Sequence, residues 1–98
     1  MKLVVQVDPD LSDLMPGFLA NKRRDADKIT AAAEAADYPA LRGMGHKIKG
    51  EGGSYGFDGI SQIGAEIERA ATEQDRAAVL RCAHELTAYL DSVEIVFE

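Results

Sequence analysis

The strongest constraint on the fold is the recurrence of apolar residues at three- and four-residue spacing, which is typical of helices that bury one side. Connections of only a few residues separate the segments with this pattern, so consecutive helices lie antiparallel. We therefore predict an all-α fold, an antiparallel up-down four-helix bundle over roughly residues 16–95. The four predicted helices cover residues 16–36, residues 37–54, residues 57–72, and a last segment that begins at Asp75 and has apolar positions up to Val93.

The two ends of the chain have other patterns. Residues 2–7 are predicted to be extended, Asp8 starts a turn or caps a helix, and residues 11–15 form a short extra helix before the bundle. The last residues, Val93–Phe97, are rich in β-branched and aromatic side chains. Two alternatives stay open for them: they extend the last helix, or they pair with Leu3–Val7.

Length and composition limit the function. A chain of 98 residues has room for one hydrophobic core, so residues 1–98 form a single domain, and 46% apolar residues are enough for it to fold. The formal net charge of −6 argues against nucleic-acid binding, which needs a broad basic surface. The single Cys82 excludes an intrachain disulfide, and no apolar stretch suits a signal peptide or membrane insertion. We expect a cytoplasmic protein, and the start at Met1 without a linker at either end favours a free-standing one.

Residues 43–56 contain six of the nine glycines of the chain. Each glycine inside a helix costs roughly 1 kcal/mol relative to alanine, so either this segment is a loop or the glycines have a purpose. Helical geometry, at about 100° per residue, favours the second interpretation. Within about 40° of the side opposite His46 lie the large apolar residues Leu41, Met44, Ile48 and Tyr55. Within about 60° of His46 itself lie Arg42, Gly43, Lys49, Gly50 and Gly53.

The side that carries His46 suits the binding of a phosphoryl group. A neutral histidine is a nucleophile, and Lys49, one turn further on, can place an ammonium group beside phosphoryl oxygens. Nearby cations add to the positive field, and glycines leave room for the active site of another protein to reach the imidazole. The candidate partner-binding residues are Arg42, Lys47, Gly50 and Gly53.

The residues around His46 resemble a known signature. Residues 46–50 read His-Lys-Ile-Lys-Gly, and small residues follow at Gly53 and Gly56. This pattern is similar to that of the histidine phosphotransfer (HPt) domain family, in which a histidine is followed by any residue, an aliphatic residue, lysine, glycine, a small residue and a second glycine. The resemblance extends through the helix predicted over residues 57–72, and it agrees with a four-helix bundle.

The resemblance implies a phosphorelay carrier of two-component signalling. His46 would accept a phosphoryl group from the aspartyl phosphate of a response-regulator receiver domain and pass it to another receiver. A sensor histidine kinase can phosphorylate the histidine from ATP instead. Lys49 would steady the phosphoryl group, while Gly50 and Gly53 would admit the receiver. The chain would then be no enzyme, because the partner completes the chemistry.

The resemblance also implies that this chain has no cofactor and no metal, since the receiver supplies the Mg²⁺. Some members of the family have a glutamine 22 residues after the histidine, which orients the imidazole. Glu68 stands at that position here. Its carboxylate can accept a hydrogen bond from one ring nitrogen and so hold the tautomer that exposes the other.

An alternative function stays open: an HPt-like adaptor that binds receiver or kinase domains without being phosphorylated. The presence of both His46 and Lys49 favours the carrier. A nucleotide-binding P-loop is rejected, because the sequence has no G-x-x-x-x-G-K-[ST] motif. The second histidine, His84, lacks comparable neighbours and is predicted to be an ordinary solvated side chain.

The sequence leaves two interpretations open for each of two further groups of residues. One is a charged cluster that we expect on a solvated helix face, with the alternative that part of it lies beside His46 and helps to select the partner. Its members are Lys22, Arg23, Arg24, Asp25, Asp27 and Lys28. The other group is apolar and belongs either to the core or to an apolar rim for the receiver. Its members are Leu11, Leu14, Met15 and Phe18.

Overall fold

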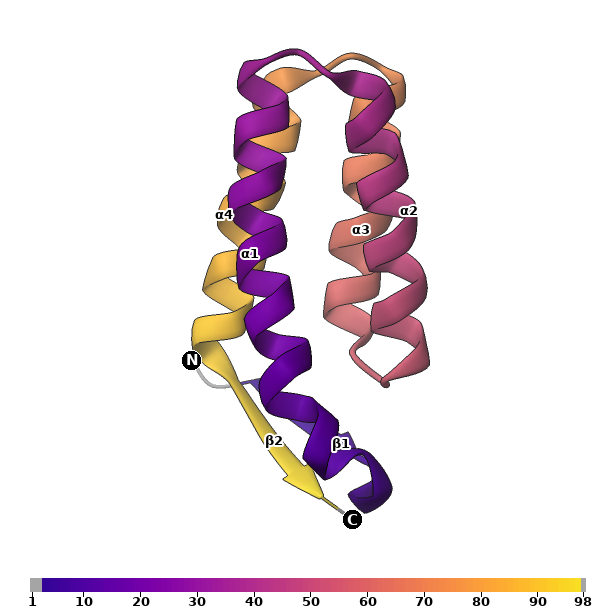
Figure 1. Cartoon of the computed structure of the whole chain (residues 1–98), viewed down its shortest axis with the longest axis vertical. Helices are drawn as coiled ribbons and strands as arrows, with labels where there is room; N and C mark the ends of the chain where they lie inside the picture. The colour runs from indigo at the N-terminus through magenta and orange to yellow at the C-terminus, as the bar shows by residue number, and fades with distance from the viewer. Residues whose placement is uncertain (1–2, 98) are drawn as a thin grey trace.

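The computed structural model describes residues 3–97. Four helices alternate in direction along the chain and are joined by short turns at the two ends of the bundle (Figure 1). Helix α1 lies beside α4, and α2 lies beside α3. This arrangement confirms the predicted up-down four-helix bundle. The bounds are α1 (Met15–Glu34), α2 (Tyr38–Ser54), α3 (Asp58–Thr72) and α4 (Arg76–Ser92).

The three turns between the helices share one design. Each contains a residue in the left-handed conformation, and the next amide donates a hydrogen bond to the carbonyl oxygen five residues earlier, which ends the helix in a Schellman arrangement. Such turns reverse the chain within a few residues, and this forces neighbouring helices to be antiparallel. The left-handed residues are Ala36 (φ 54°), Gly56 (φ 83°) and Gln74 (φ 56°).

Aspartates begin two of the helices. The Asp37 carboxylate accepts a hydrogen bond from the Ala40 amide at 3.3 Å, and Asp75 accepts one from the Ala78 amide at 3.1 Å. Each bond satisfies one of the amides that a helix leaves unpaired in its first turn. The predicted helix starts at Asp37 and Asp75 are therefore confirmed.

The core lies along the axis of the bundle, and all four helices contribute to it. The apolar stripes found in the sequence face inward, as the spacing predicts. Completely or almost completely buried side chains include Ile29, Leu41, Ile48, Ile60, Ile67 and Leu86.

The two ends of the chain form a small sheet below the bundle (Figure 1). Strand β1 (Leu3–Val7) pairs in parallel with strand β2 (Val93–Phe97). Helix α4 runs directly into β2, whereas the chain reverses between β1 and α1. Because α1 and α4 are antiparallel, the two strands point the same way. Of the two alternatives for Val93–Phe97, the structure therefore shows strand pairing; the predicted extension to residue 2 lies outside the described residues.

The reversal after β1 is made by a short 3-10 helix, η1 (Pro9–Leu14), which continues into α1. This confirms a short N-terminal extra helix, although it begins two residues before the predicted position. Among the apolar residues of uncertain role, Met15 and Phe18 belong to the core, whereas Leu14 is 50% exposed. Phe18 stacks on Phe57, which ties the start of α1 to the start of α3.

The prediction that Lys22 lies on a solvated face is wrong. Its side chain is buried, with 2% exposure, because this part of α1 faces α2. The charge is tolerated because two carboxylates meet the ammonium group, Asp25 at 2.7 Å and Glu51 at 2.5 Å. The neighbouring residues Arg23 and Arg24 are exposed, as predicted.

Within residues 3–97, no helix is long and apolar enough to cross a membrane.

Candidate functional site

The site is built where α2 and α3 touch through their backbones. A Cβ atom added to Gly45 would lie 2.6 Å from the Glu68 amide nitrogen and 2.8 Å from the Gly64 carbonyl oxygen. One added to Gly52 would lie 2.5 Å from the Ser61 amide nitrogen, and one on Gly64 would collide with the Lys49 amide nitrogen. The glycines therefore allow a close approach that other residues forbid, and this approach brings α3 side chains within reach of α2.

His46 lies on the outer side of α2, and its side chain is 74% exposed. Its Nδ1 atom is 3.2 Å from Glu68 Oε2 on α3. An ionised carboxylate only accepts hydrogen bonds, so this contact places a proton on Nδ1. The neutral ring then has its free lone pair on Nε2, the nitrogen that Glu68 does not contact.

Glu68 also lies close to a cation. The Lys49 ammonium is 3.9 Å from Glu68 Oε1, and the Lys49 side chain is half exposed. One carboxylate thus contacts both an imidazole and an ammonium group on successive turns of α2. In this arrangement the positive charge of Lys49 is near the ring but remains accessible to solvent and to a ligand.

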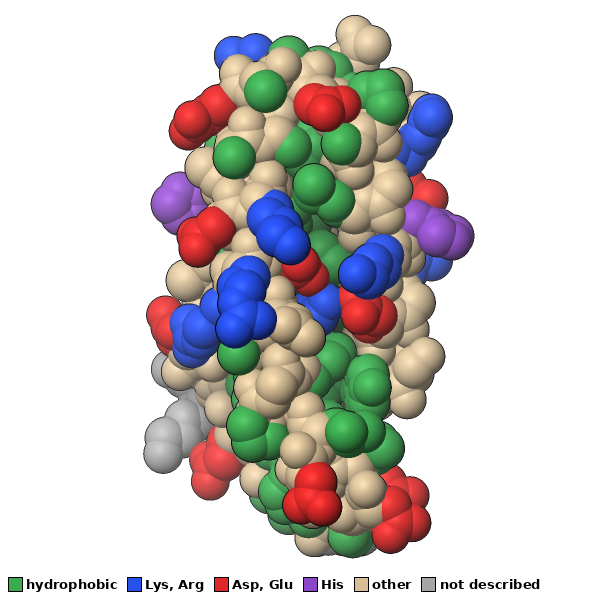
Figure 2. Space-filling model, in the orientation of Figure 1, with side chains coloured by type: hydrophobic (Ala, Val, Ile, Leu, Met, Phe, Trp, Pro, Cys, Tyr) green, Lys and Arg blue, Asp and Glu red, His purple; other side chains and the backbone are tan. Residues whose placement is uncertain are grey.

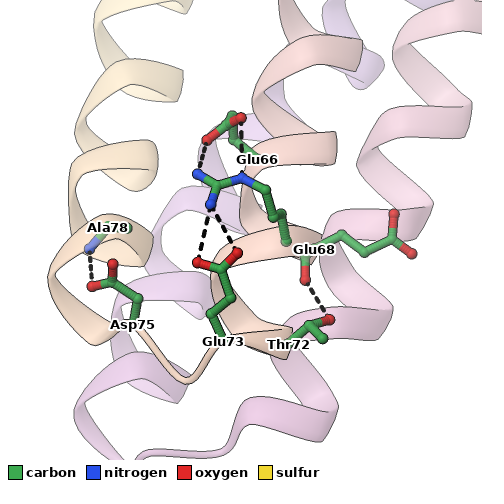
Figure 3. A network of polar contacts seen from close by, with 7 residues as sticks. Glu66, Glu68, Thr72, Glu73, Asp75 and Ala78 are labelled. Atoms are coloured by element: carbon green, nitrogen blue, oxygen red, sulfur yellow. Dashed lines mark hydrogen bonds and ion pairs between the residues drawn. The ribbon is translucent and has the colours of Figure 1, made fainter.

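Contacts within α3 and its C-terminal end keep Glu68 available for α2. Arg69, the next residue, is held by Glu66 at 2.6 Å and by Glu73 at 3.1 Å. Its hydrogen bond and charge lower the pKa of Glu66. Figure 3 shows the Glu68 side chain extending away from this network, while the Thr72 hydroxyl donates to the Glu68 carbonyl oxygen at 2.9 Å. Arg69 therefore does not compete with His46 for Glu68.

A hollow of about 430 Å³ lies beside the imidazole. Its openness comes from glycine, because a Cβ on Gly50 would meet nothing within 4 Å, and one on Gly53 would meet only the Ser61 hydroxyl at 3.9 Å. The Ser61 hydroxyl donates to the Lys49 carbonyl oxygen at 3.0 Å, so it stabilises the wall of the hollow. The lining residues are His46, Lys49, Gly50, Gly53, Ser54 and Ser61.

The remaining predicted residues do not line the hollow. Arg42 is exposed one turn before His46. Lys47 is exposed as well and lines a different hollow, between α1 and α2. His84 is exposed on α4, as predicted for an ordinary surface histidine.

Sequence reasoning missed Ser61 and the packing role of Gly45, Gly52 and Gly64. Ser61 has no signal of its own, since its position beside Lys49 depends on how α3 is placed against α2. Two of the glycines did have a signal in the sequence, because Gly45 and Gly52 lie seven residues apart, which is two turns along one face of a helix.

One of the comparisons with known proteins gives a match. A sequence model described as the Hpt domain matches residues 13–95, which is most of the chain. No curated protein and no solved structure gives a match. The matched region includes all four helices, the exposed His46 and the Glu68 beside it. The chain therefore belongs to the Hpt, or histidine phosphotransfer, domain family.

Proposed function

We propose that His46 carries the phosphoryl group of a phosphorelay, and that the chain exchanges this group with aspartates of response-regulator receiver domains. Family membership supports a carrier of phosphoryl groups in two-component signalling. The observation that carries the assignment to His46 is its exposed ring with Nδ1 held by Glu68, which leaves Nε2 as the accessible nucleophile.

In the proposed step, the lone pair of His46 Nε2 attacks the phosphorus of an aspartyl phosphate. The N–P bond forms as the P–O bond to the aspartate breaks, and the aspartate leaves as a carboxylate. The proton on Nδ1 stays on the ring, where Glu68 stabilises the positive charge that develops. Transfer to a second receiver is the same step in reverse.

The neighbouring residues have distinct proposed roles. Lys49 stabilises the phosphoryl oxygens, which its half-exposed ammonium group can reach. Gly50 and Gly53 keep the hollow open for the receiver, and the exposed Arg42 and Lys47 add positive charge on α2. We propose no cofactor or metal on this chain, with the Mg²⁺ bound by the receiver.

Glu68 is proposed as a positioning residue. It stands where some family members have a glutamine, and like that amide oxygen its carboxylate can accept a hydrogen bond from the ring. Unlike an amide it carries a charge, and it lies between the imidazole and Lys49. Its proposed effect is to fix the ring and its tautomer.

The proposed partners are receiver domains and a sensor histidine kinase, which supplies the phosphoryl group from ATP. We propose that the protein acts with these partners in the cytoplasm. Neither nucleic acid nor a membrane is a proposed partner, in line with the net charge of −6.

The test is transfer of labelled phosphate from phosphorylated receiver domains encoded in the same genome. We expect the wild-type chain to be labelled through a bond that acid breaks and alkali does not, as for phosphohistidine. His46→Gln should abolish labelling, whereas the matched variant His84→Gln should not change it. Equal labelling of His46→Gln would overturn the assignment. Binding of receivers without labelling by any receiver or kinase would instead indicate the adaptor.

A further inference from the structure

A second hollow, of about 230 Å³, lies between α1 and α2 on the face shown in Figure 2. Figure 2 shows Lys and Arg side chains gathered across this face, in a chain whose net charge is negative. We call this hollow the basic groove. Its lining residues are Asn21, Lys22, Arg24, Asp25, Lys28, Lys47 and Glu51.

One cation of the basic groove, Lys22, is buried. Burial alone lowers the pKa of Lys22, but the hydrogen bonds and charges of Asp25 and Glu51 outweigh it and raise the pKa above its ordinary value. The ammonium group of Lys22 also lies 5.5 Å from the centre of the Phe18 ring. Both carboxylates of the groove point at it, at 2.7 and 2.5 Å.

Because both carboxylates of the groove pair with Lys22, the other cations of the groove have no carboxylate partner there. Within residues 3–97, Arg24, Lys28 and Lys47 make no ion pair. Arg24 only donates a hydrogen bond to the neutral Asn21 side chain, at 2.7 Å. The lining thus has four cations against two carboxylates, and three of the cations are exposed to solvent.

The basic groove begins beside the proposed phosphorylation site. Lys47 lines the groove, and it directly follows His46 on α2. Consecutive residues of a helix differ by about 100° in direction, so the side of α2 that carries Lys47 adjoins the side that carries His46. When two proteins are docked, charges that face each other lie closer together than the screening length, which is roughly 8 Å in physiological salt. Arg24 and Lys28 of α1 line the same groove as Lys47, so their charges act on a protein that docks at His46 and extends over Lys47.

We propose that the basic groove binds carboxylates on the surface of the phosphoryl-exchange partner, next to that partner's phosphoryl group. This inference rests on the proposed function of His46. Carboxylates are the complement of three exposed cations whose local acids are already occupied, and such complementarity raises association rates and selects among partners. The groove thus selects receivers with an acidic rim over receivers without one.

The test reverses two charges on α1 and leaves α2 untouched. In the double variant Arg24→Glu/Lys28→Glu, we expect the second-order rate of transfer from a phosphorylated receiver to fall about tenfold or more at low salt, with a weaker dependence on salt than in wild type. The matched control is Arg76→Glu/Arg81→Glu on α4, which changes the net charge equally outside the groove; we expect less than about a twofold change. Melting temperatures of both variants check that they fold.

Labelling by phosphoramidate, a small phosphoryl donor, separates the two proposals. If His46 reacts with it equally in wild type and in the α1 variant, a slower transfer from receivers reports docking alone. Equal losses in the α1 and α4 variants, or no loss in either, would overturn the groove. If His46 takes no phosphoryl group from any donor, the proposal that it is a phosphoryl carrier is wrong. Receiver affinities measured by calorimetry then still test whether the basic groove binds the partner. Unchanged affinity in the α1 variant, or no binding by any receiver, would overturn the proposed role of the groove.

Discussion

Helix α2 uses glycine in two opposite ways. On its inner face, Gly45 and Gly52 lie against the backbone of α3, where an added methyl group has no space. On its outer face, Gly43 and Gly50 lie in the open, where an added methyl group would touch nothing. The inner glycines allow two helices to pack, whereas the outer ones keep a surface free of side chains.

The difference shows that the reason for a glycine depends on its surroundings and not on its residue type. All of these glycines lower helix propensity by a similar amount. At Gly45 the loss is offset by close packing of α2 on α3, which also brings Glu68 to His46. At Gly50, no contact within residues 3–97 offsets it, and the proposed docking of a receiver is what would offset it. Four substitutions test the difference between the inner face of α2, which packs on α3, and its outer face.

The largest effect is expected for Ile48→Asp on the inner face. Ile48 is 1% exposed, and a carboxylate there would be buried without a partner. We expect a loss of more than about 4 kcal/mol in the free energy of unfolding, enough to abolish the cooperative transition in circular dichroism. Lys47→Asp, one residue away and exposed, is the control and should melt close to wild type. A folded Ile48→Asp would contradict the inward orientation of this face.

Next comes Gly64→Ala, on the α3 side of the close contact. The new methyl group would collide with the Lys49 amide nitrogen, so the two helices must move apart. Overpacking of this kind costs about 1–3 kcal/mol, measured by urea denaturation. We also expect slower phosphoryl transfer, because the separation moves Glu68 away from His46. Stability equal to or above wild type would show that the backbones are not in contact here.

Gly50→Ala should act in the opposite sense on stability. Its methyl group has open space, so the higher helix propensity of alanine should stabilise the protein by up to about 1 kcal/mol. Transfer from receivers should slow, because the methyl group enters the hollow beside His46. Gly43→Ala is the matched control, equally open but outside the hollow, and should stabilise without slowing transfer. If both variants transfer equally fast, the opening at Gly50 is not needed.

The smallest change in stability is expected for Lys49→Ala. The Lys49 ammonium is half exposed and 3.9 Å from Glu68, and exposed pairs of this kind contribute about 0–1 kcal/mol. We expect a change in the free energy of unfolding within about 0.5 kcal/mol and a transfer rate lower by about tenfold or more. Arg81→Ala on α4 should change neither. A large loss of stability would mean that Lys49 is structural.

Much of the site followed from local pattern. The distribution of residues around α2 predicted that His46 faces solvent opposite a buried Ile48, and the aspartate before each helix predicted where α2 and α4 begin. Such features depend on residues a few positions apart on one helix, and helical geometry alone relates them. The family signature identified His46 and Lys49 because both lie on α2, a few positions apart in the sequence.

Features that depend on two elements were harder to predict. Glu68 was found only because the family has an orienting residue there, and Ser61 was missed. Lys22 looked like part of a solvated charged face, because nothing in α1 itself shows that Glu51 of α2 lies opposite. The burial of a lysine can be predicted only when its carboxylate partners are known.

By itself, the sequence determined four amphipathic helices with tight turns between them, and one helix side where a histidine lies among cations and glycines. These properties follow from side-chain periodicity and from hydrogen bonds between residues close in the chain. Only the tertiary structure decided which glycines pack and which stay open, that Lys22 is buried, and that β1 pairs with β2. The physical reason is that each of these depends on the distance between different elements, which the packing of α2 on α3, of α1 on α2 and of α1 on α4 sets.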